Sequence, residues 1–136
     1  MKKSILLFVI VLLLVGCNNG KDTFLTTNTE DQYHEQRKEI ERILKDDQHV
    51  KRVTALLTNN EAIVGIEVKP LSKWNKKKYE IKWQKELKKA LPEQEVVAST
   101  DLKIIIETDK LAKKNLEEKK LDKKIKGLKK LKEEET

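Results

Sequence analysis

The sequence predicts an α+β domain: a small three-stranded antiparallel sheet covered by amphipathic helices in the order α-β-β-α-β-α, followed by a long basic C-terminal helix. Two observations predict this class. Two β-branched runs flank a pair of asparagines near mid-chain, and the segments on either side repeat apolar residues at helical spacing among lysines and glutamates. Because sheets of so few strands need helical cover, we expect the helices to lie on one face of the sheet.

The N-terminus has the composition of an export signal. Lys2 and Lys3 precede residues 5–15, which are all apolar. A helix of this length covers roughly 16 Å, about half of a ~30 Å hydrocarbon core, so the run is short for a membrane span. We therefore expect residues 1–16 to be a signal peptide and exclude them from the fold.

The only cysteine of the chain, Cys17, follows this run directly. Residues 14–17, Leu-Val-Gly-Cys, resemble a bacterial lipobox, whose thiol receives diacylglycerol before the chain is cut in front of it. The alternative is an ordinary signal peptide with an incidental cysteine. An exported protein with a lone free thiol is unusual, whereas an acylated cysteine has no thiol left. We expect Cys17 to be lipidated, with two or more acyl chains for stable attachment.

Residues 17–30 are expected to form a lipidated flexible tether, since they show little periodicity and many turn formers. An amphipathic helix should follow, ending near Asp47, with Thr29 or Asp31 as its cap. Its apolar stripe consists of Tyr33, Ile40, Ile43 and Leu44.

Residues 50–70 predict a β-hairpin. Asn59 and Asn60 separate the two β-branched runs, and asparagine tolerates the positive φ that a two-residue hairpin turn requires. Pairing around this turn places the apolar residues on one face of the hairpin. The predicted pairs are Val53 with Ile66, Ala55 with Val64, Leu57 with Ala62 and, on the other face, Arg52 with Glu67.

A second amphipathic helix should follow Pro70, with Ser72 as its cap, and should end at Pro92. Its stripe, which we expect against the hairpin, consists of Tyr79, Trp83, Leu87, Ala90 and Leu91.

Two large side chains of this segment, Trp74 and Ile81, fall opposite the stripe. An exposed tryptophan in a basic helix is suited to a lipid interface or a partner's groove. The other interpretation is that Trp74 folds back over the start of the helix. The residues expected to contact a partner or membrane are Trp74, Lys76, Lys77, Lys78 and Ile81.

The last third of the chain contains a segment whose pattern fits either a strand or a helix. Residues 95–100 predict a short third strand. In residues 101–118, three consecutive isoleucines favour a strand, whereas Asp101 as a cap and an apolar side with Leu102, Ile105, Ile106 and Ala112 favour a helix. Residues 116–136 should form a charged helix or tail, weakened at Gly127.

The uneven charge indicates the kind of surface that the protein meets. Residues 71–91 hold eight lysines and two glutamates, and residues 110–136 hold eleven lysines and six acids. For an exported protein, such charge suits anionic lipid or wall polymer rather than nucleic acid. The alternative is that the lysines form a merely solvated face.

The sequence lacks recognisable catalytic or cofactor motifs. His34 and His49 have no metal-ligand spacing, the serines have no Gly-x-Ser-x-Gly context, and there is no P-loop. With 39% charged and 4% aromatic residues, the chain has material for one thin core and little to enclose a pocket. We expect no enzyme, cofactor or metal, and favour a binding or scaffolding module.

Several segments together resemble the YhcN/YlaJ-type sporulation lipoproteins of endospore-forming bacteria, and most closely their YlaJ-like branch. These segments, within residues 1–115, are the lipobox, the "VKRVTALLTNNEAIVGIEVK" hairpin, the lysine-rich helix closing at "ALPEQ", and "VVASTD". The resemblance favours a helix over residues 101–118, although "IIIE" departs from the family's usual sequence.

The resemblance implies a lipid-anchored protein on the outer face of the cell or spore membrane that acts in germination or outgrowth, with spore-envelope or germination proteins as partners. The alternative function is electrostatic adhesion to an anionic bilayer or wall polymer. The expected organisation is a signal peptide (1–16), a tether (17–30), an α+β domain (31–115) and a charged C-terminal segment (116–136).

Overall fold

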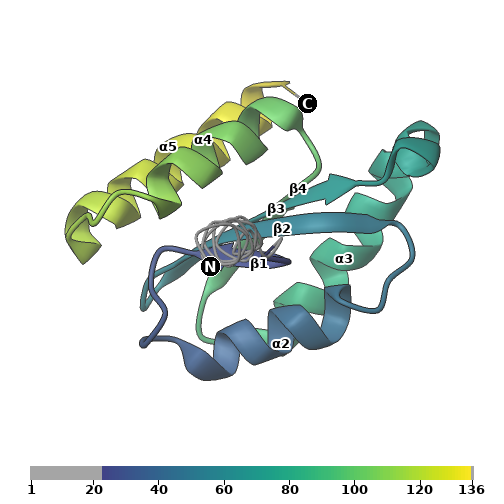
Figure 1. Ribbon diagram of the computed structural model, residues 1–136. Coiled ribbons are helices and arrows are strands. Elements are labelled where there is room, and N and C mark those ends of the chain that lie inside the picture. The colour runs from purple at the N-terminus through teal and green to yellow at the C-terminus, as the bar shows by residue number, and fades with distance from the viewer. Residues whose placement is uncertain (1–22, 136) are drawn as a thin grey trace, which may run out of the picture.

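A central sheet lies between two layers of helices in the computed structural model, which describes residues 23–135 (Figure 1). The signal peptide, Cys17 and the first part of the tether lie outside the described residues. The elements in chain order are β1 (Leu25–Thr27), α2 (His34–Leu44), β2 (Val50–Leu57), β3 (Glu61–Val68), the 3₁₀-helix η1 (Pro70–Asn75), α3 (Lys76–Ala90), β4 (Glu95–Ser99), α4 (Leu102–Ala112) and α5 (Glu118–Glu135).

The sheet has four strands in the order β1-β2-β3-β4 and is mixed, so the predicted three-stranded antiparallel sheet is wrong. Only β2 and β3 pair antiparallel, whereas β1 is parallel to β2 and β4 is parallel to β3. The unexpected strand, Leu25–Thr27, lies within the segment predicted as a tether. Because parallel neighbours need a crossover connection, α2 joins β1 to β2 and α3 joins β3 to β4.

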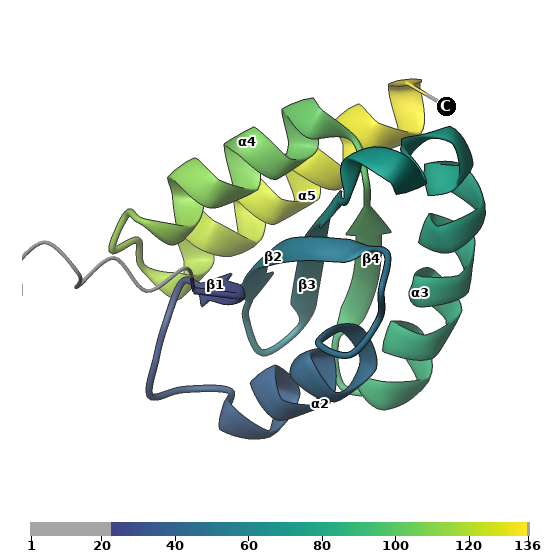
Figure 2. The same cartoon turned by 45° about the vertical axis from the view of Figure 1, so that its right-hand side comes forward.

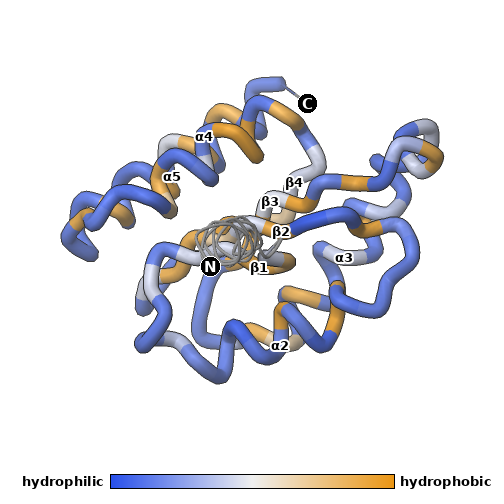
Figure 3. Tube along the Cα trace, in the orientation of Figure 1, coloured by the Kyte–Doolittle hydropathy of each residue, from blue (hydrophilic) through white to orange (hydrophobic). Residues whose placement is uncertain are grey.

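Helices cover both faces of the sheet, and the expectation of cover on one face is also wrong (Figures 1 and 2). Helices α2 and α3 pack on the face that carries Val53, Ala55 and Val64. Helices α4 and α5 pack on the other face, against Leu56 and Ile63. Apolar residues are frequent along the strands in Figure 3, and β2 and β3 therefore need burial on both sides.

The predicted hairpin register is confirmed. Val53 lies opposite Ile66, Ala55 opposite Val64, Leu57 opposite Ala62, and Arg52 opposite Glu67. The turn conformation differs from the prediction, because Tyr33 is the only non-glycine residue with positive φ in the described part of the chain. The turn is closed instead by Thr58, whose N–H donates to the Glu61 carbonyl at 2.9 Å and whose Oγ1 accepts the Glu61 N–H at 3.0 Å.

Helix α2 begins after Tyr33, which has a left-handed φ of 59°, and no side chain caps it. The predicted caps Thr29 and Asp31 are therefore wrong. The Tyr33 hydroxyl instead donates to Glu118 Oε1 at 2.5 Å, at the start of α5. Partial burial and this hydrogen bond raise the pKa of Tyr33 above its ordinary range. The contact ties the start of α2 to the start of α5 and holds Tyr33 in its strained backbone position.

Helix α3 buries the central part of its predicted stripe. Trp83 and Leu87 are fully buried, and Trp83 Nε1 donates to Asp47 Oδ2 at 2.9 Å. Ser72 does not cap this helix, because η1 precedes it and Asn75 occupies the cap position.

Residues 102–112 form a helix, α4, as the capping pattern indicated. Asp101 accepts hydrogen bonds from the N–H groups of Lys103 and Ile104 at 2.8 and 3.3 Å. Gly65 lets α4 approach β3 closely, since a Cβ there would lie 3.2 Å from Ile105 Cγ1. The buried face differs from the predicted side, which included Leu102 and Ile106. It consists of Ile104, Ile105, Thr108 and Leu111.

Helix α5 is part of the packed structure, because Leu121, Ile125 and Leu128 join the core under α4. Two of its lysines form largely buried ion pairs, Lys129 with Glu61 and Lys132 with Glu80. The same Nζ atoms donate to the carbonyls of Glu95 and Ala98 on β4.

Side chains bond backbone groups of β4 and of the end of β2 that β1 leaves unpaired. On β4, Gln84 accepts the Ala98 N–H at 2.6 Å and donates to the Val96 carbonyl at 2.8 Å. At the other edge, Asn28 follows the short strand β1 and bonds both the N–H and the carbonyl of Leu57. These contacts satisfy backbone groups that could otherwise pair with another chain.

Substituting Lys129 with Ala should destabilise the fold by about 3 kcal/mol, because it leaves the Glu61 carboxylate buried without its partner. Urea unfolding should show a lower midpoint at an unchanged m-value. The matched control is Lys130→Ala, which removes an exposed neighbour on the same helix and should change stability by less than about 0.5 kcal/mol. Equal effects of the two substitutions would contradict a structural role for the ion pair.

Glu118 should make stability depend on pH in the acid range. The hydrogen bonds from Tyr33 and the Asn59 N–H lower the pKa of Glu118. The unfolded chain therefore binds the proton more tightly, so this stabilisation is present above about pH 4.3, the ordinary glutamate value, and is lost as pH falls through the folded pKa.

Acidification from pH 7 to pH 3 should accordingly reduce the free energy of unfolding of the native chain more than that of a Glu118→Gln variant. Chemical denaturation at both pH values measures the difference. Glu117→Gln, at an exposed neighbouring position, is the control and should follow the native chain.

Candidate contact surface

The candidate site lies at one end of the sheet, which we call the η1 end. Strand β2 begins there at Val50 opposite Val68, and β3 leaves the sheet there to form η1. Strand β4 runs towards the same end and finishes at Ser99, after which Asp101 starts α4. In Figure 2 the first turns of α3 and α4 lie with the C-terminus at this end.

Polar and aromatic contacts fix η1 to the end of the sheet. Ser72 is buried, and its Oγ lies 2.9 Å from His49 Nδ1. The His49 ring stacks on Tyr79 with 4.0 Å between ring centroids. The backbone adds two hydrogen bonds of 2.9 Å, from the Lys69 N–H to the His49 carbonyl and from the Ser72 N–H to the Lys69 carbonyl.

With Ser72 directed inward, η1 presents two large apolar residues to solvent. Leu71 is 96% exposed and Trp74 is 94% exposed. The two are three residues apart, and side chains at this spacing eclipse in a 3₁₀-helix, so they lie on one outward face. The interpretation in which Trp74 folds back over the helix is wrong, and its exposure is confirmed.

Two further exposed apolar residues lie on the helices that start at the η1 end. Ile81 on α3 is 54% exposed, and Leu102, the first residue of α4, is 63% exposed. A shallow hollow lined by residues from the first turn of α3, including Lys76, and by Thr100 and Asp101 lies between the starts of α3 and α4. Leu102 follows Asp101 directly at the start of α4.

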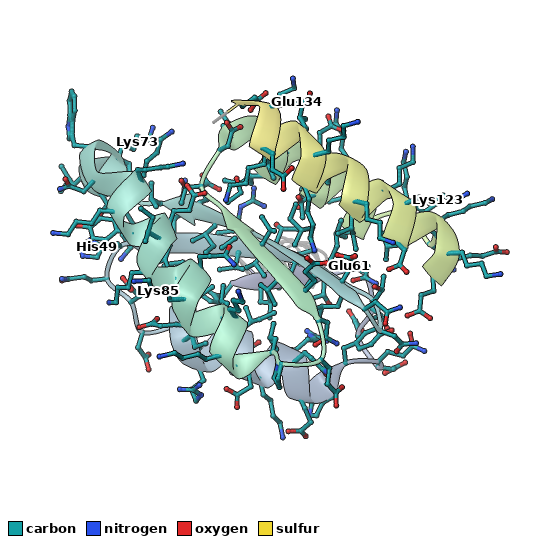
Figure 4. The ribbon with its side chains drawn as sticks, turned by 180° about the vertical axis from the view of Figure 1, so that it is seen from behind. His49, Glu61, Lys73, Lys85, Lys123 and Glu134 are labelled. Carbon is teal, nitrogen blue, oxygen red and sulfur yellow. The ribbon has the colours of Figure 1, made fainter. Side chains whose placement is uncertain are left out.

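The chain segment around Trp74 is rich in lysine. Residues 69–78 contain five lysines and no acid. All five lysines are exposed, and none forms a salt bridge within residues 23–135. In Figure 4, Lys73 projects from the corner of the domain, whereas Glu61 lies between the sheet and α5.

Several acids near this end already have partners. Glu80 pairs with Lys132 and accepts from Thr100, and Asp47 accepts from Trp83. Glu67 faces Arg52, whose guanidinium lowers the pKa of this carboxyl. Asp101 and Glu135 line the hollow beside Lys76, but no salt bridge within residues 23–135 involves a lysine of residues 69–78. We define the η1 surface as residues 69–78 with Ile81 and Leu102.

The described chain enters the sheet beside the part of β2 that is nearer the η1 end. Leu25 pairs with Val53, and the Phe24 carbonyl accepts the Val53 N–H at 2.8 Å. Lys51 and Lys113 line the hollow next to Phe24. The segment that leads to Cys17 therefore joins the domain at an edge strand, at a position nearer the start of β2 than its end.

Sequence reasoning found part of the η1 surface. It predicted Trp74, Lys76, Lys77, Lys78 and Ile81 as contact residues, and all five are exposed. It missed Leu71 and Leu102. The i, i+3 spacing of Leu71 and Trp74 directly after Pro70 was an available signal for the first, whereas the exposure of Leu102 depends on how α4 packs.

Both histidines of the chain lie within the described residues. His49 is engaged with Ser72 and Tyr79, and His34 is exposed at the start of α2. Within residues 23–135, no group of three or more His, Cys, Asp or Glu side chains is arranged to hold a metal ion. The arrangement at the η1 surface suits binding through apolar and cationic side chains.

Comparison with known proteins identifies the anchor. A prokaryotic membrane lipoprotein lipid attachment site matches residues 1–18, a span that includes Cys17. Neither a curated protein nor a solved structure matches the chain. In the described part of the chain, no helix is long and apolar enough to cross a membrane. The protein is an exported lipoprotein that is anchored at a membrane.

The two tryptophans should respond oppositely to truncation. Trp74→Ala should change the free energy of unfolding by less than about 0.5 kcal/mol, because the side chain is almost fully exposed. Trp83→Ala should cost about 3–5 kcal/mol, because it leaves a core cavity and removes the partner of Asp47. Denaturant titration measures both, and a large loss on truncating Trp74 would place that residue in the core.

Proposed function

We propose that this lipoprotein is a non-catalytic binding module that uses the η1 surface as its contact site and contributes to spore germination or outgrowth. The observation that carries the binding role is the exposure of Leu71 and Trp74 on a helix held in place by Ser72 and His49. Exposed apolar patches on soluble domains mark interaction sites. Trp is also among the residues enriched at binding hot spots.

The spore role rests on the resemblance to the YhcN/YlaJ-type lipoproteins in the hairpin, the lysine-rich helix and the "VVASTD" segment. It predicts that the protein acts on the outer face of the cell or spore membrane, with spore-envelope or germination proteins as candidate partners and no nucleic acid.

Adhesion to an anionic bilayer or wall polymer is a second candidate function. It is favoured by the five exposed lysines of residues 69–78, which have no salt-bridge partner among the described residues. High salt weakens such attraction, because exposed charges are screened over about 10 Å at 0.1 M ionic strength.

In the native host, replacing Leu71 and Trp74 together with Ser should slow germination while leaving the amount of lipidated protein in the membrane fraction unchanged. Both side chains are exposed, so the fold should persist. Germination kinetics and membrane fractionation measure the two quantities. Lys120→Ala, an exposed change at the start of α5, is the control and should have no effect.

A Cys17→Ala strain tests the anchor separately. Mass spectrometry should show the loss of the lipid, and germination should slow as in the Leu71/Trp74 variant. Normal germination in both strains would contradict the spore role, and normal germination in the Leu71/Trp74 strain alone would contradict the role of the η1 surface.

A further inference from the structure

The apolar residues of the η1 surface protrude from the domain. Leu71 and Trp74 are almost fully exposed on η1, and Leu102 is a third exposed apolar residue, at the start of α4. Tryptophan is enriched where proteins meet the headgroup layer of a bilayer, because its ring is apolar and its N–H is polar. Leu71 and Trp74, which we call the tip, are therefore suited to insertion among lipid headgroups.

The tip is preorganised. The hydrogen bond between Ser72 and His49 and the stacking of His49 on Tyr79 hold η1 in one position relative to the sheet. Binding through Leu71 and Trp74 therefore requires little additional ordering of the backbone.

Lysines dominate the charge of the segment that carries the tip, although Asp101 and Glu135 share a hollow with Lys76. The five lysines of residues 69–78 surround Trp74 in the sequence without an intervening acid. Lysines close to an anionic leaflet are each attracted to it, and the attraction falls off within a Debye length. Apolar side chains combined with lysines are the features by which surface segments bind anionic membranes.

The length of chain before the domain permits this contact. Seven residues separate Cys17 from Leu25, and the eight residue-to-residue steps between the two, at 3.3–3.6 Å each, reach at most roughly 29 Å. Leu25 lies two strands away from Ile66, and Pro70 is four residues further on, so the offset from Leu25 to Pro70 is about 16 Å. The η1 end can therefore touch the membrane that holds the lipid.

Anchoring also raises the effective concentration of the domain at that membrane, so that weak docking is sufficient. From these observations we infer that the η1 surface docks onto the anionic bilayer in which the lipid of Cys17 is anchored, with Leu71 and Trp74 at the level of the headgroups. This inference rests on the proposed function and names the partner of its contact site.

The test uses the lipidated mature protein in vesicles of phosphatidylcholine with or without phosphatidylglycerol. The emission spectrum of Trp74 is obtained by subtracting the spectrum of a Trp74→Phe variant from that of the native protein, since Trp83 is buried in both. In anionic vesicles this difference spectrum should shift to the blue and should be quenched by brominated lipids. Neutral vesicles, or anionic vesicles in 1 M salt, should largely abolish both effects.

A matched pair of charge variants tests the location of the contact. K73Q/K76Q/K77Q removes three lysines from the η1 surface and should reduce the quenching to the level in neutral vesicles. K119Q/K120Q/K123Q removes three exposed lysines near the start of α5, which contacts the hairpin turn at the opposite end of the sheet, and should leave the quenching unchanged. Figure 4 shows Lys73 and Lys123 at opposite ends of the domain.

The inference is overturned if the Trp74 emission in anionic vesicles neither shifts to the blue nor is quenched by brominated lipids. Equal losses of quenching in the two charge variants would overturn it as well. The proposed function is judged separately by germination of the Leu71/Trp74 strain. Slower germination without lipid contact would indicate a protein or wall-polymer partner at the same surface. Lipid contact with normal germination of that strain would support the docking and contradict a role of the η1 surface in germination.

Discussion

The β2–β3 hairpin is apolar on both of its faces, and the rest of the architecture depends on this constraint. Val53 and Val64 need cover on one side, and Leu56 and Ile63 need cover on the other. Burying one face alone would leave large aliphatic side chains in water at a cost of roughly 1.5–3 kcal/mol each. The chain meets this demand with α2 and α3 on the first face and with α4 and α5 on the second.

The second layer is held by charge as well as by apolar packing. Lys129 and Lys132 of α5 reach across the sheet edge to Glu61, Glu80 and the free carbonyls of β4. At the opposite end of α5, Glu118 bonds the hairpin turn and Tyr33. The C-terminal helix is thereby fixed at both ends, which orders a segment whose composition alone is typical of a solvated charged tail.

The sequence predicted the contacts that depend on local pattern and missed those that depend on distant partners. Alternation around Asn59 and Asn60 fixed the hairpin register, and Asp101 marked the start of α4. Strand β1 has only three residues, and it exists because β2 offers an unpaired edge. The exposure of Trp74 depends on the contact of Ser72 with His49, 23 residues earlier in the chain, which no local pattern reveals.

Lysine has two different physical roles in this protein, and its position relative to the sheet decides between them. At α5 the ammonium groups are largely buried and meet carboxylates and carbonyls, so that they stabilise the fold. At residues 69–78 the lysines form no salt bridge within the described chain and stand around an exposed tryptophan. Since the fold already pairs Glu80 with Lys132, that acid is not available to neutralise them. The ion pair that fixes α5 thus also preserves the positive charge of the η1 surface.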